Sequence, residues 1–351
     1  MSQNVKIALF IVISVLLVTF TFYGWQITQT PNFQQDKDKD FALLIPESAT
    51  YDTVLDSLKK HEVLNDHISF RFMAKLLNYP ERVQPGRYLL KKSMGNWAAL
   101  QKLRHGQQDP VRLTFNNVRL KEDLIERIGT RFAFGPQKLG ELLRSDSVCQ
   151  KYGFDTTTIV SMFLPNTYEI FWTTPPQKLL GRMYDEYQKF WTAGRRAKAK
   201  EINLTPVQVA TLASIVEEEQ GPKRDERPRI AGMYINRLRT NMPLQADPTI
   251  KFALKDFAIK RILLNQLSVI SPYNTYRNTG LPPGPIRLAE LNSLDAVLNY
   301  ESHNYTYMCA KADFSGYHAF AENYKDHLIN AATYQNALNQ RKITPRPTKM
   351  R

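Results

Sequence analysis

The stretch TPVQVATLASIVEEEQ (Thr205–Gln220) decides the fold of the C-terminal half of the chain. Thr205 and Gln208 have the spacing of a capping box, and Pro206 stands at the first helical position, where its missing N–H costs nothing. Apolar residues then recur at helical spacing, at Val209, Leu212, Ala213 and Val216. The pattern predicts a buried helix that ends in three carboxylates.

These carboxylates, Glu217, Glu218 and Glu219, point to different sides of the helix, because successive residues are turned by about 100°. Glu218 falls opposite the apolar stripe, so we expect it in solvent. Glu217 and Glu219 fall on the two flanks of the stripe. The flank of Glu217 carries three small residues, Ala210, Ala213 and Ser214. A bulky group could therefore approach Glu217, whereas Glu219 has larger neighbours and less room.

A carboxylate half buried beside an apolar stripe has a raised pKa and can act as a general acid near neutral pH. The alternative is a solvated helix end whose acids pair with basic residues further along the chain. Those residues are Lys223, Arg224, Arg227 and Arg229. Periodicity alone favours this alternative.

Composition limits the class of protein. The chain has 351 residues, enough for two domains or for one elaborated domain with appendages. With 43% hydrophobic residues it can bury a real core and is not disordered. Its formal net charge of +14 implies an anionic neighbour, which could be nucleic acid, acidic lipid or an acidic polymer. Two cysteines, Cys149 and Cys309, indicate neither a disulfide framework nor a zinc site. Two lone buried thiols are favoured over a single disulfide.

The N-terminal segment Ile7–Trp25 is almost uninterruptedly apolar and would span about 28 Å as a helix. We interpret it as an uncleaved transmembrane helix, because it is too long for a signal peptide and no small-x-small cleavage site follows. Lys6 precedes it, and the mixed run DKDKD (Asp36–Asp40) follows. This charge pattern favours a short cytoplasmic N-terminus and an extracytoplasmic body, which disfavours nucleic acid as the partner.

The predicted fold class is α+β: a single transmembrane helix, small strand–helix modules and a mixed α/β domain. The three modules begin at Phe41, Gly86 and Val111, each with a β-rich run before an amphipathic helix. Such modules commonly bind extended polymers, although they could equally serve as a spacer. The expected divisions are 1–6 cytoplasmic, 7–25 transmembrane, 26–40 linker, 41–130 modules, 131–161 connecting helix and loop, 162–342 catalytic domain and 343–351 basic tail.

Two further stretches attract attention in the C-terminal domain. LQADPT (Leu244–Thr249) is a polar turn that carries Gln245 and Asp247. SPYNTYRNTGLPPGPI (Ser271–Ile286) is rich in Pro, Gly, Asn and Tyr. Such a sequence predicts a long ordered loop, and loops of this kind are usually functional.

These motifs, together with ASIVEEE and YINRL (Tyr234–Leu238), resemble those of the endolytic murein transglycosylases, the MltG or YceG-like family. The resemblance covers about Met162–Lys342 and extends to the anchor and to the modules, which are LysM-like. In that family the carboxylate that closes the ASIVE helix is catalytic, which implies Glu217 and reverses the preference from periodicity. Glu218 stands where relatives often have Lys, and Leu288-Ala289-Glu290 replaces the usual Asn-Pro-Gly.

The resemblance implies cleavage of the MurNAc-β-1,4-GlcNAc bond within nascent glycan strands, which limits strand length. Glu217 would protonate the leaving oxygen and then accept the proton of the muramic C6 hydroxyl, leaving a 1,6-anhydro end. One acid suffices, with no cofactor and no metal. Four residues are expected to orient the sugars, the alternative being hydrogen bonds within the loops: Gln245, Asp247, Asn274 and Tyr276.

Two other functions stay open at this point. One is a lysozyme-type hydrolase with Glu217 as acid and Asp247 or Glu169 as the second carboxylate. The other is a non-catalytic, membrane-anchored scaffold that binds glycan. The family reading implies a single-pass protein of the cytoplasmic (inner) membrane with a periplasmic catalytic domain. Its expected partners are peptidoglycan strands, the cytoplasmic membrane and peptidoglycan synthases, and not nucleic acid.

Overall fold

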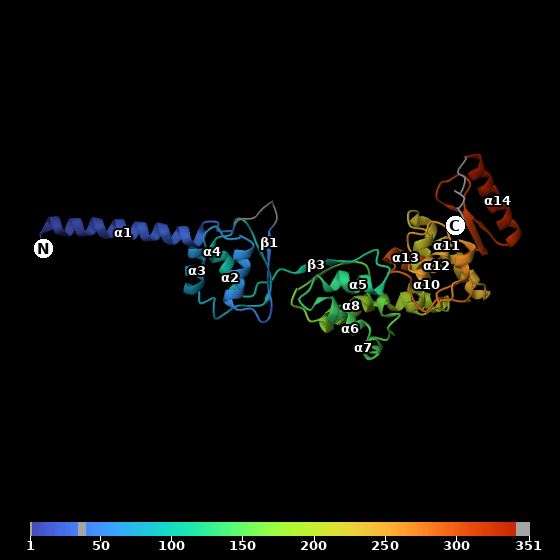
Figure 1. Cartoon of the computed structure of the whole chain (residues 1–351), viewed down its shortest axis with the longest axis horizontal. Helices are drawn as coiled ribbons and strands as arrows, with labels where there is room; N and C mark the ends of the chain where they lie inside the picture. The colour runs from blue at the N-terminus through green and yellow to red at the C-terminus, as the bar shows by residue number, and fades with distance from the viewer. Residues whose placement is uncertain (1, 34–39, 342–351) are drawn as a thin grey trace, which may run out of the picture. The chain divides into compact units, whose positions relative to one another are not determined.

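The computed structural model describes residues 2–33 and 40–341, and the chain divides into two compact units (Figure 1). Unit 1 comprises Met1–Leu113, Gly129–Gly135 and Tyr168–Pro175, and unit 2 comprises the remainder. The fold is mixed α/β. Most of the DKDKD run and the predicted basic tail at 343–351 lie outside the described residues.

Helix α1 (Gln3–Gln29) opens unit 1 and has a mean hydropathy of 2.5 over its most apolar window, with none of that window buried. It is long and apolar enough to cross a membrane, which makes it compatible with a membrane anchor. The helix continues four residues past the predicted end at Trp25. Asn32 and Phe33 are already buried in the unit, so the predicted linker at 26–40 begins too early.

The rest of unit 1 is built on a two-stranded antiparallel sheet. Strand β1 pairs with β2, with Leu43 opposite Tyr88, and both side chains lie in the core. The first two predicted modules therefore share one sheet and one core instead of folding separately. The elements are β1 (Phe41–Ile45), α2 (Tyr51–Lys60), α3 (His67–Leu76), β2 (Gly86–Leu90) and α4 (Asn96–Arg104).

The third predicted module is not a repeat of the others. Strand β3 (Val111–Thr114) pairs with β4 (Thr167–Ile170), and nearly all of helix α5 (Lys121–Gly129) belongs to unit 2. The pattern of an extended run followed by an amphipathic helix was read correctly, but partners distant in sequence decide where each piece packs. The LysM-like character of this region stays a prediction.

Unit 2 is mainly helical and carries one hairpin, in which β5 pairs antiparallel with β6. Its helices are α6 (Gly135–Leu143), α7 (Asp146–Lys151), α8 (Pro176–Phe190), α9 (Ala193–Glu201), α10 (Pro206–Glu219), α11 (Arg227–Arg239), α12 (Asp247–Leu254), α13 (Leu291–Leu298) and α14 (Tyr324–Gln340). Its strands are β5 (Tyr307–Ala310) and β6 (His318–Ala321), and short 3-10 helices are η1 (Ile159–Met162), η2 (Arg224–Glu226) and η3 (Leu264–Ser268).

Helix α10 forms the centre of unit 2. Its predicted capping box is confirmed: the Thr205 hydroxyl accepts the Gln208 N–H, and the Gln208 side chain accepts the Thr205 N–H. The small flank admits the segment before α13, because the Ser214 hydroxyl accepts the Ile286 N–H at 3.0 Å. The bulky group expected beside Glu217 is therefore the segment around Ile286 of the same chain.

The two cysteines, Cys149 and Cys309, are free thiols, as composition favoured. Cys149 is buried as expected, whereas Cys309 is partly exposed.

Candidate active site at the end of helix α10

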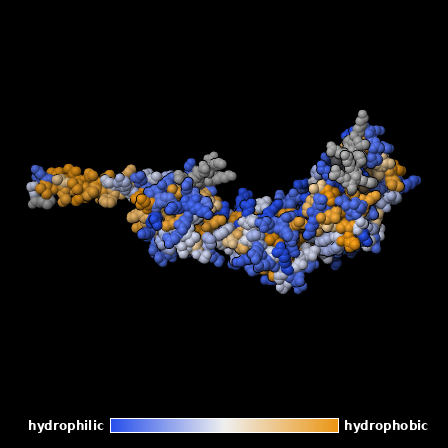
Figure 2. All heavy atoms as spheres, in the orientation of Figure 1, coloured by the Kyte–Doolittle hydropathy of each residue, from blue (hydrophilic) through white to orange (hydrophobic). Residues whose placement is uncertain are grey.

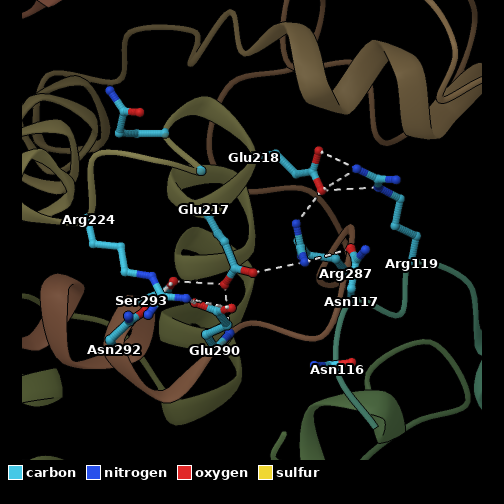
Figure 3. A network of polar contacts seen from close by, with 12 residues as sticks. Asn116, Asn117, Arg119, Glu217, Glu218, Arg224, Arg287, Glu290, Asn292 and Ser293 are labelled. Atoms are coloured by element: carbon cyan, nitrogen blue, oxygen red, sulfur yellow. Dashed lines mark hydrogen bonds and ion pairs between the residues drawn. The ribbon is translucent and has the colours of Figure 1, made fainter. Parts of the chain in front are cut away.

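Glu217 is almost completely enclosed, with 3% of its surface exposed. Its Oε1 lies 2.9 Å from Nη2 of Arg287, and its Oε2 accepts the Glu290 N–H at 2.7 Å and the Ser293 hydroxyl at 2.8 Å (Figure 3). Burial raises the pKa of the Glu217 carboxyl, and the charge of Arg287 and the two hydrogen bonds oppose that rise. Burial outweighs these contacts, so the pKa of Glu217 stays above its usual value. Both oxygens are nevertheless occupied by donors, an arrangement that suits a structural role.

Glu218 is also paired. Arg119 donates two hydrogen bonds of 3.1 Å to its oxygens, and Nη1 of Arg287 lies 2.6 Å from Oε1. Only 16% of the Glu218 side chain is exposed, so the expectation that it lies in solvent is wrong. Helical geometry predicted its direction, but the segment that carries Arg119 covers that side of α10. Figure 3 shows Arg287 between the two acids.

Glu219 differs from both neighbours, because none of the basic residues that the structure describes lies at ion-pair distance from it. Its Oε1 accepts the Tyr234 hydroxyl at 2.8 Å, and its side chain is partly exposed. Desolvation raises the pKa of the Glu219 carboxyl to about 7, and the charge of Asp247 adds to the rise. The Tyr234 hydrogen bond and the nearby charges of His318 and Lys251 oppose it. At neutral pH the group is therefore present in both protonation states.

Two of the four predicted sugar-orienting residues meet beside Glu219. Asp247 begins α12 and lies close enough to raise the pKa of Glu219. Tyr276, in the long loop, lies close enough to raise the pKa of Tyr234. The Tyr276 hydroxyl donates to Oδ1 of Asp247 at 2.5 Å, which joins the LQADPT turn to the SPYNTY loop. Burial and the Asp247 carboxylate raise the pKa of Tyr276, so its hydroxyl remains a donor.

Gln245 strengthens the same connection. It adopts a left-handed backbone conformation, with φ of 50°, and its N–H donates to the Thr275 carbonyl at 3.0 Å. Arg237 donates to the Leu244 carbonyl at 2.7 Å and lies 3.5 Å from Oε1 of Gln245. These contacts fix the turn at the start of α12.

Asn274, the fourth predicted residue, has 0% of its surface exposed. Its amide donates to the Leu267 and Val269 carbonyls at 2.9 and 2.8 Å, and its Oδ1 accepts the Tyr276 N–H at 3.0 Å. The alternative of loop-internal hydrogen bonding describes this side chain. Asn274 shapes the loop that presents Tyr276.

The family model described as YceG-like family matches residues 43–333. This chain belongs to the YceG-like family. It is 27% identical to the endolytic murein transglycosylase of Bacillus subtilis (strain 168), over 88% of each chain. It is also 27% identical to the endolytic murein transglycosylase of Streptococcus pneumoniae serotype 2, over 93% of this chain but 65% of that protein.

The fold of this YceG-like chain is also that of a solved structure, a putative YceG-like protein from Listeria monocytogenes. The two share 24% sequence identity and a TM-score of 0.54, and the match covers 84% of this chain and 99% of that one. The likeness extends over most of the chain and supports the mixed α/β architecture.

Sequence reasoning assigned no role in the site to three residues of this YceG-like chain that lie around Glu219 or position its neighbours. Tyr234 donates to Glu219 directly, and His318 lies near enough to lower the pKa of Glu219. Glu226 fixes His318, because its oxygens lie 2.8 Å from Nδ1 and from the backbone nitrogen of His318. Burial disfavours ionised Glu226, but hydrogen bonds from His318 and Gln220 lower its pKa below the usual value. Tyr234 stood in a recognised motif, but no local pattern linked it to Glu219.

Proposed function

We propose that this chain is a membrane-anchored endolytic lytic transglycosylase. It would cut the MurNAc-β-1,4-GlcNAc bond within nascent glycan strands without water and so limit strand length. Membership of the YceG-like family and the names of the two curated relatives support this activity. The observation that carries it in this chain is the partly exposed Glu219 carboxyl, with a pKa of about 7, next to Asp247.

We further propose Glu219, and not Glu217, as the acid of the reaction. An acid must hold a proton and reach the substrate oxygen. Glu217 is enclosed and each of its oxygens faces a donor, whereas Glu219 accepts a hydrogen bond from Tyr234 and is partly exposed. The motif implied the carboxylate that closes the helix, and the environment favours the acid one half-turn further on.

In the proposed reaction, protonated Glu219 gives its proton to the glycosidic oxygen as the C1–O bond of the muramic residue breaks. Positive charge develops on the sugar ring, as in glycosidases. The ionised carboxylate then takes the proton of the muramic C6 hydroxyl, and that oxygen bonds to C1. The products are a GlcNAc end with a free 4-hydroxyl and a 1,6-anhydro muramic end. Glu219 returns to its starting state, so one acid suffices.

The neighbouring groups have separate proposed roles. Tyr234 orients the Glu219 carboxyl through the 2.8 Å hydrogen bond and favours its ionised form in the second half of the reaction. Asp247, Tyr276 and Gln245 offer polar atoms to sugar hydroxyl and N-acetyl groups. Asn274 acts indirectly, by holding the loop of Tyr276.

We propose that α1 places the enzyme at the outer face of the cytoplasmic membrane, with the N-terminus inside. The apolar length of α1 and the charge pattern around it support this topology. New glycan strands emerge at that surface, where peptidoglycan synthases are the expected protein partners. The proposed LysM-like part of unit 1 would contact the same strands. Labelling of a cysteine introduced in unit 2 by a membrane-impermeant reagent in intact spheroplasts tests the topology.

Product analysis tests the activity. The full-length chain in nanodiscs is incubated with uncrosslinked glycan strands, and the fragments are analysed by mass spectrometry. We expect shorter strands with 1,6-anhydro ends. Reducing ends in place of anhydro ends would show a lysozyme-type hydrolase, and binding without any cleavage would show a scaffold. Either result would refute the proposed function.

A further inference from the structure

Helix α3 in unit 1 carries a second apolar face that the core does not use. Its inner face is buried through Phe70, Met73 and Ala74. On the other side Ile68, Phe72 and Leu76 are 82%, 57% and 66% exposed. Residues four apart lie above one another on one side of a helix, so these three form a continuous stripe. We call it the α3 stripe. Three large apolar side chains in a row on a surface usually mark an interaction site.

The α3 stripe begins next to the end of the apolar helix α1. A cavity of about 560 Å³ lies between them, lined by Tyr23 and Ile27 of α1 and by Ile68 and Phe72 of α3. Figure 1 shows α3 at the end of unit 1 from which α1 projects, and Figure 2 shows apolar surface gathered there. If Tyr23 lies at the boundary between headgroups and acyl chains, as tyrosines at the ends of membrane helices do, the start of the α3 stripe lies at the same depth.

Buried asparagines hold α1 against the rest of unit 1. Asn96, which begins α4, donates to the Ile27 carbonyl at 2.9 Å and to the Ser69 hydroxyl of α3 at 2.9 Å. The Asn32 amide donates to Oδ1 of Asn96 at 2.7 Å. Both asparagines are at least 96% buried. Because unmaking such bonds in a buried site is unfavourable, the direction of α1 is fixed relative to α3.

Charge on α3 fits a membrane surface. His67, Arg71 and Lys75 are exposed and each immediately precedes a residue of the α3 stripe, so a basic row runs beside the apolar one. An apolar face bordered by basic residues is typical of helices that lie in the interface of anionic bilayers. The long basic side chains can reach lipid phosphates while the stripe enters the acyl boundary.

We propose that the α3 stripe is a second membrane contact, which lies in the surface of an anionic bilayer beside the anchor. The cavity between α1 and α3 would then be filled by part of a lipid acyl chain. This inference rests on the proposed crossing of the membrane by α1. Two contacts joined by a fixed angle would hold unit 1 in one orientation on the bilayer, whereas a helix on a loose linker would let it rotate.

Site-specific fluorescence in nanodiscs tests the proposal on the full chain. A polarity-sensitive probe is attached to Phe72→Cys in a background with Cys149→Ala and Cys309→Ala. Matched probes are placed on Trp25→Cys in α1 and on Leu264→Cys, a site in unit 2 that is 87% exposed. We expect blue-shifted emission and quenching by brominated lipids at positions 25 and 72, and neither at position 264.

The outcomes separate the stripe from the anchor. Lipid contact at position 25 with an aqueous signal at position 72 would overturn the α3 contact and leave the anchor intact. An aqueous signal at position 25 would overturn both. Purified nanodiscs contain only the scaffold protein besides this chain, so a stripe that docks a cellular protein partner would also give an aqueous signal. A smaller blue shift at position 72 after Arg71→Gln with Lys75→Gln, in anionic but not in zwitterionic lipid, would support the role of the basic row.

Discussion

Glu217 and Glu219 lie two residues apart on one helix, and the contrast between them comes from what other segments bring to each. Glu217 faces the segment that leads into α13, which supplies Arg287, a backbone N–H and the Ser293 hydroxyl. Glu219 faces α11 and the start of α12, which supply one tyrosine hydroxyl and the carboxylate of Asp247. The same residue type is thus enclosed by donors on one side of α10 and left partly exposed beside a second carboxylate on the other.

Among substitutions that test the difference between the two acids, the largest expected effect is the loss of catalytic rate in Glu219→Gln. Glutamine keeps the shape of the side chain but has no proton to give and no charge to take one back. General acid–base groups contribute about 10²–10⁴-fold, so we expect the rate of anhydro-end formation to fall by about that factor. The rate is measured by mass spectrometry under single-turnover conditions.

The matched control for this loss is Glu201→Gln, which removes an exposed acid at the end of α9 and should leave the rate unchanged. Thermal unfolding of Glu219→Gln should match that of the parent or lie above it, because the variant no longer buries an ionisable group. Normal activity in Glu219→Gln, with inactivity in a well-folded Glu217→Gln, would return the catalytic role to Glu217.

The next effect is on stability, in Glu217→Gln. The substitution leaves the nearly enclosed Arg287, 10% exposed, with Glu218 as its remaining acidic partner. Breaking a buried pair from one side lowers the free energy of unfolding by about 3 kcal/mol. Urea unfolding followed by circular dichroism measures it, and Arg287→Gln should lose a similar amount. A change below about 0.5 kcal/mol, the range of ordinary surface substitutions, would contradict the structural role of Glu217.

A smaller effect is expected on the pH dependence of kcat/KM, and Tyr234→Phe tests it. Protonated Glu219 is needed to start the reaction, so kcat/KM should fall above its pKa of about 7. The Tyr234 hydroxyl favours the ionised form, and its removal should raise the pKa of Glu219 and move this limb to higher pH. Tyr317→Phe is the control, because its hydroxyl bonds another carboxylate, Asp225, at 2.9 Å. A limb that stays in place in Tyr234→Phe would contradict the assignment.

The raised pKa of Glu219 should also make the free energy of unfolding depend on pH. The folded protein keeps a proton on Glu219 up to about pH 7, whereas the unfolded chain releases it near the ordinary value of 4.5. The contribution of Glu219 to the free energy of unfolding therefore falls as pH rises across that window. Glu219→Gln should lose this dependence, so the difference between variant and parent should grow in favour of the variant from pH 5 to pH 8.

The sequence predicted the features that depend on neighbouring residues and not those that depend on contacts between distant segments. The capping box, the apolar stripe of α10 and the apolar length of α1 are local patterns, and the structure contains all three. The flanking position of Glu219 was also read correctly, but the flank was judged by the residues of α10 alone. Tyr234 and Arg287 reach the acids from segments that no periodicity connects to α10. The choice between the acids therefore needed the tertiary structure.

The prediction of three separate strand–helix modules was wrong for the same reason: it rested on local sequence patterns alone. Local alternation found β1, β2 and β3, but it carries no information on which strand pairs with which. The pairing of β1 with β2 and of β3 with β4 depends on cross-strand contacts such as Leu43 with Tyr88. Similar local patterns therefore suggested three repeats, whereas β1 and β2 form one sheet and β3 pairs with β4 in another.

The smallest expected effect, in Glu218→Gln, sharpens the contrast by asking what the middle acid contributes. A helical wheel puts Glu218 in solvent, and an exposed acid would leave stability unchanged. The structure pairs it with Arg119 and Arg287 at 16% exposure, so we expect a loss of about 1 kcal/mol in the free energy of unfolding. Arg119→Gln should cost a similar amount, and the double variant should lose less than the sum of the two, because both remove one interaction. Additive losses would mean that Glu218 and Arg119 do not interact in solution. Catalysis should be unaffected in all three variants, since Glu218 and Arg119 contact each other and Arg287, whereas Glu219 is held by Tyr234.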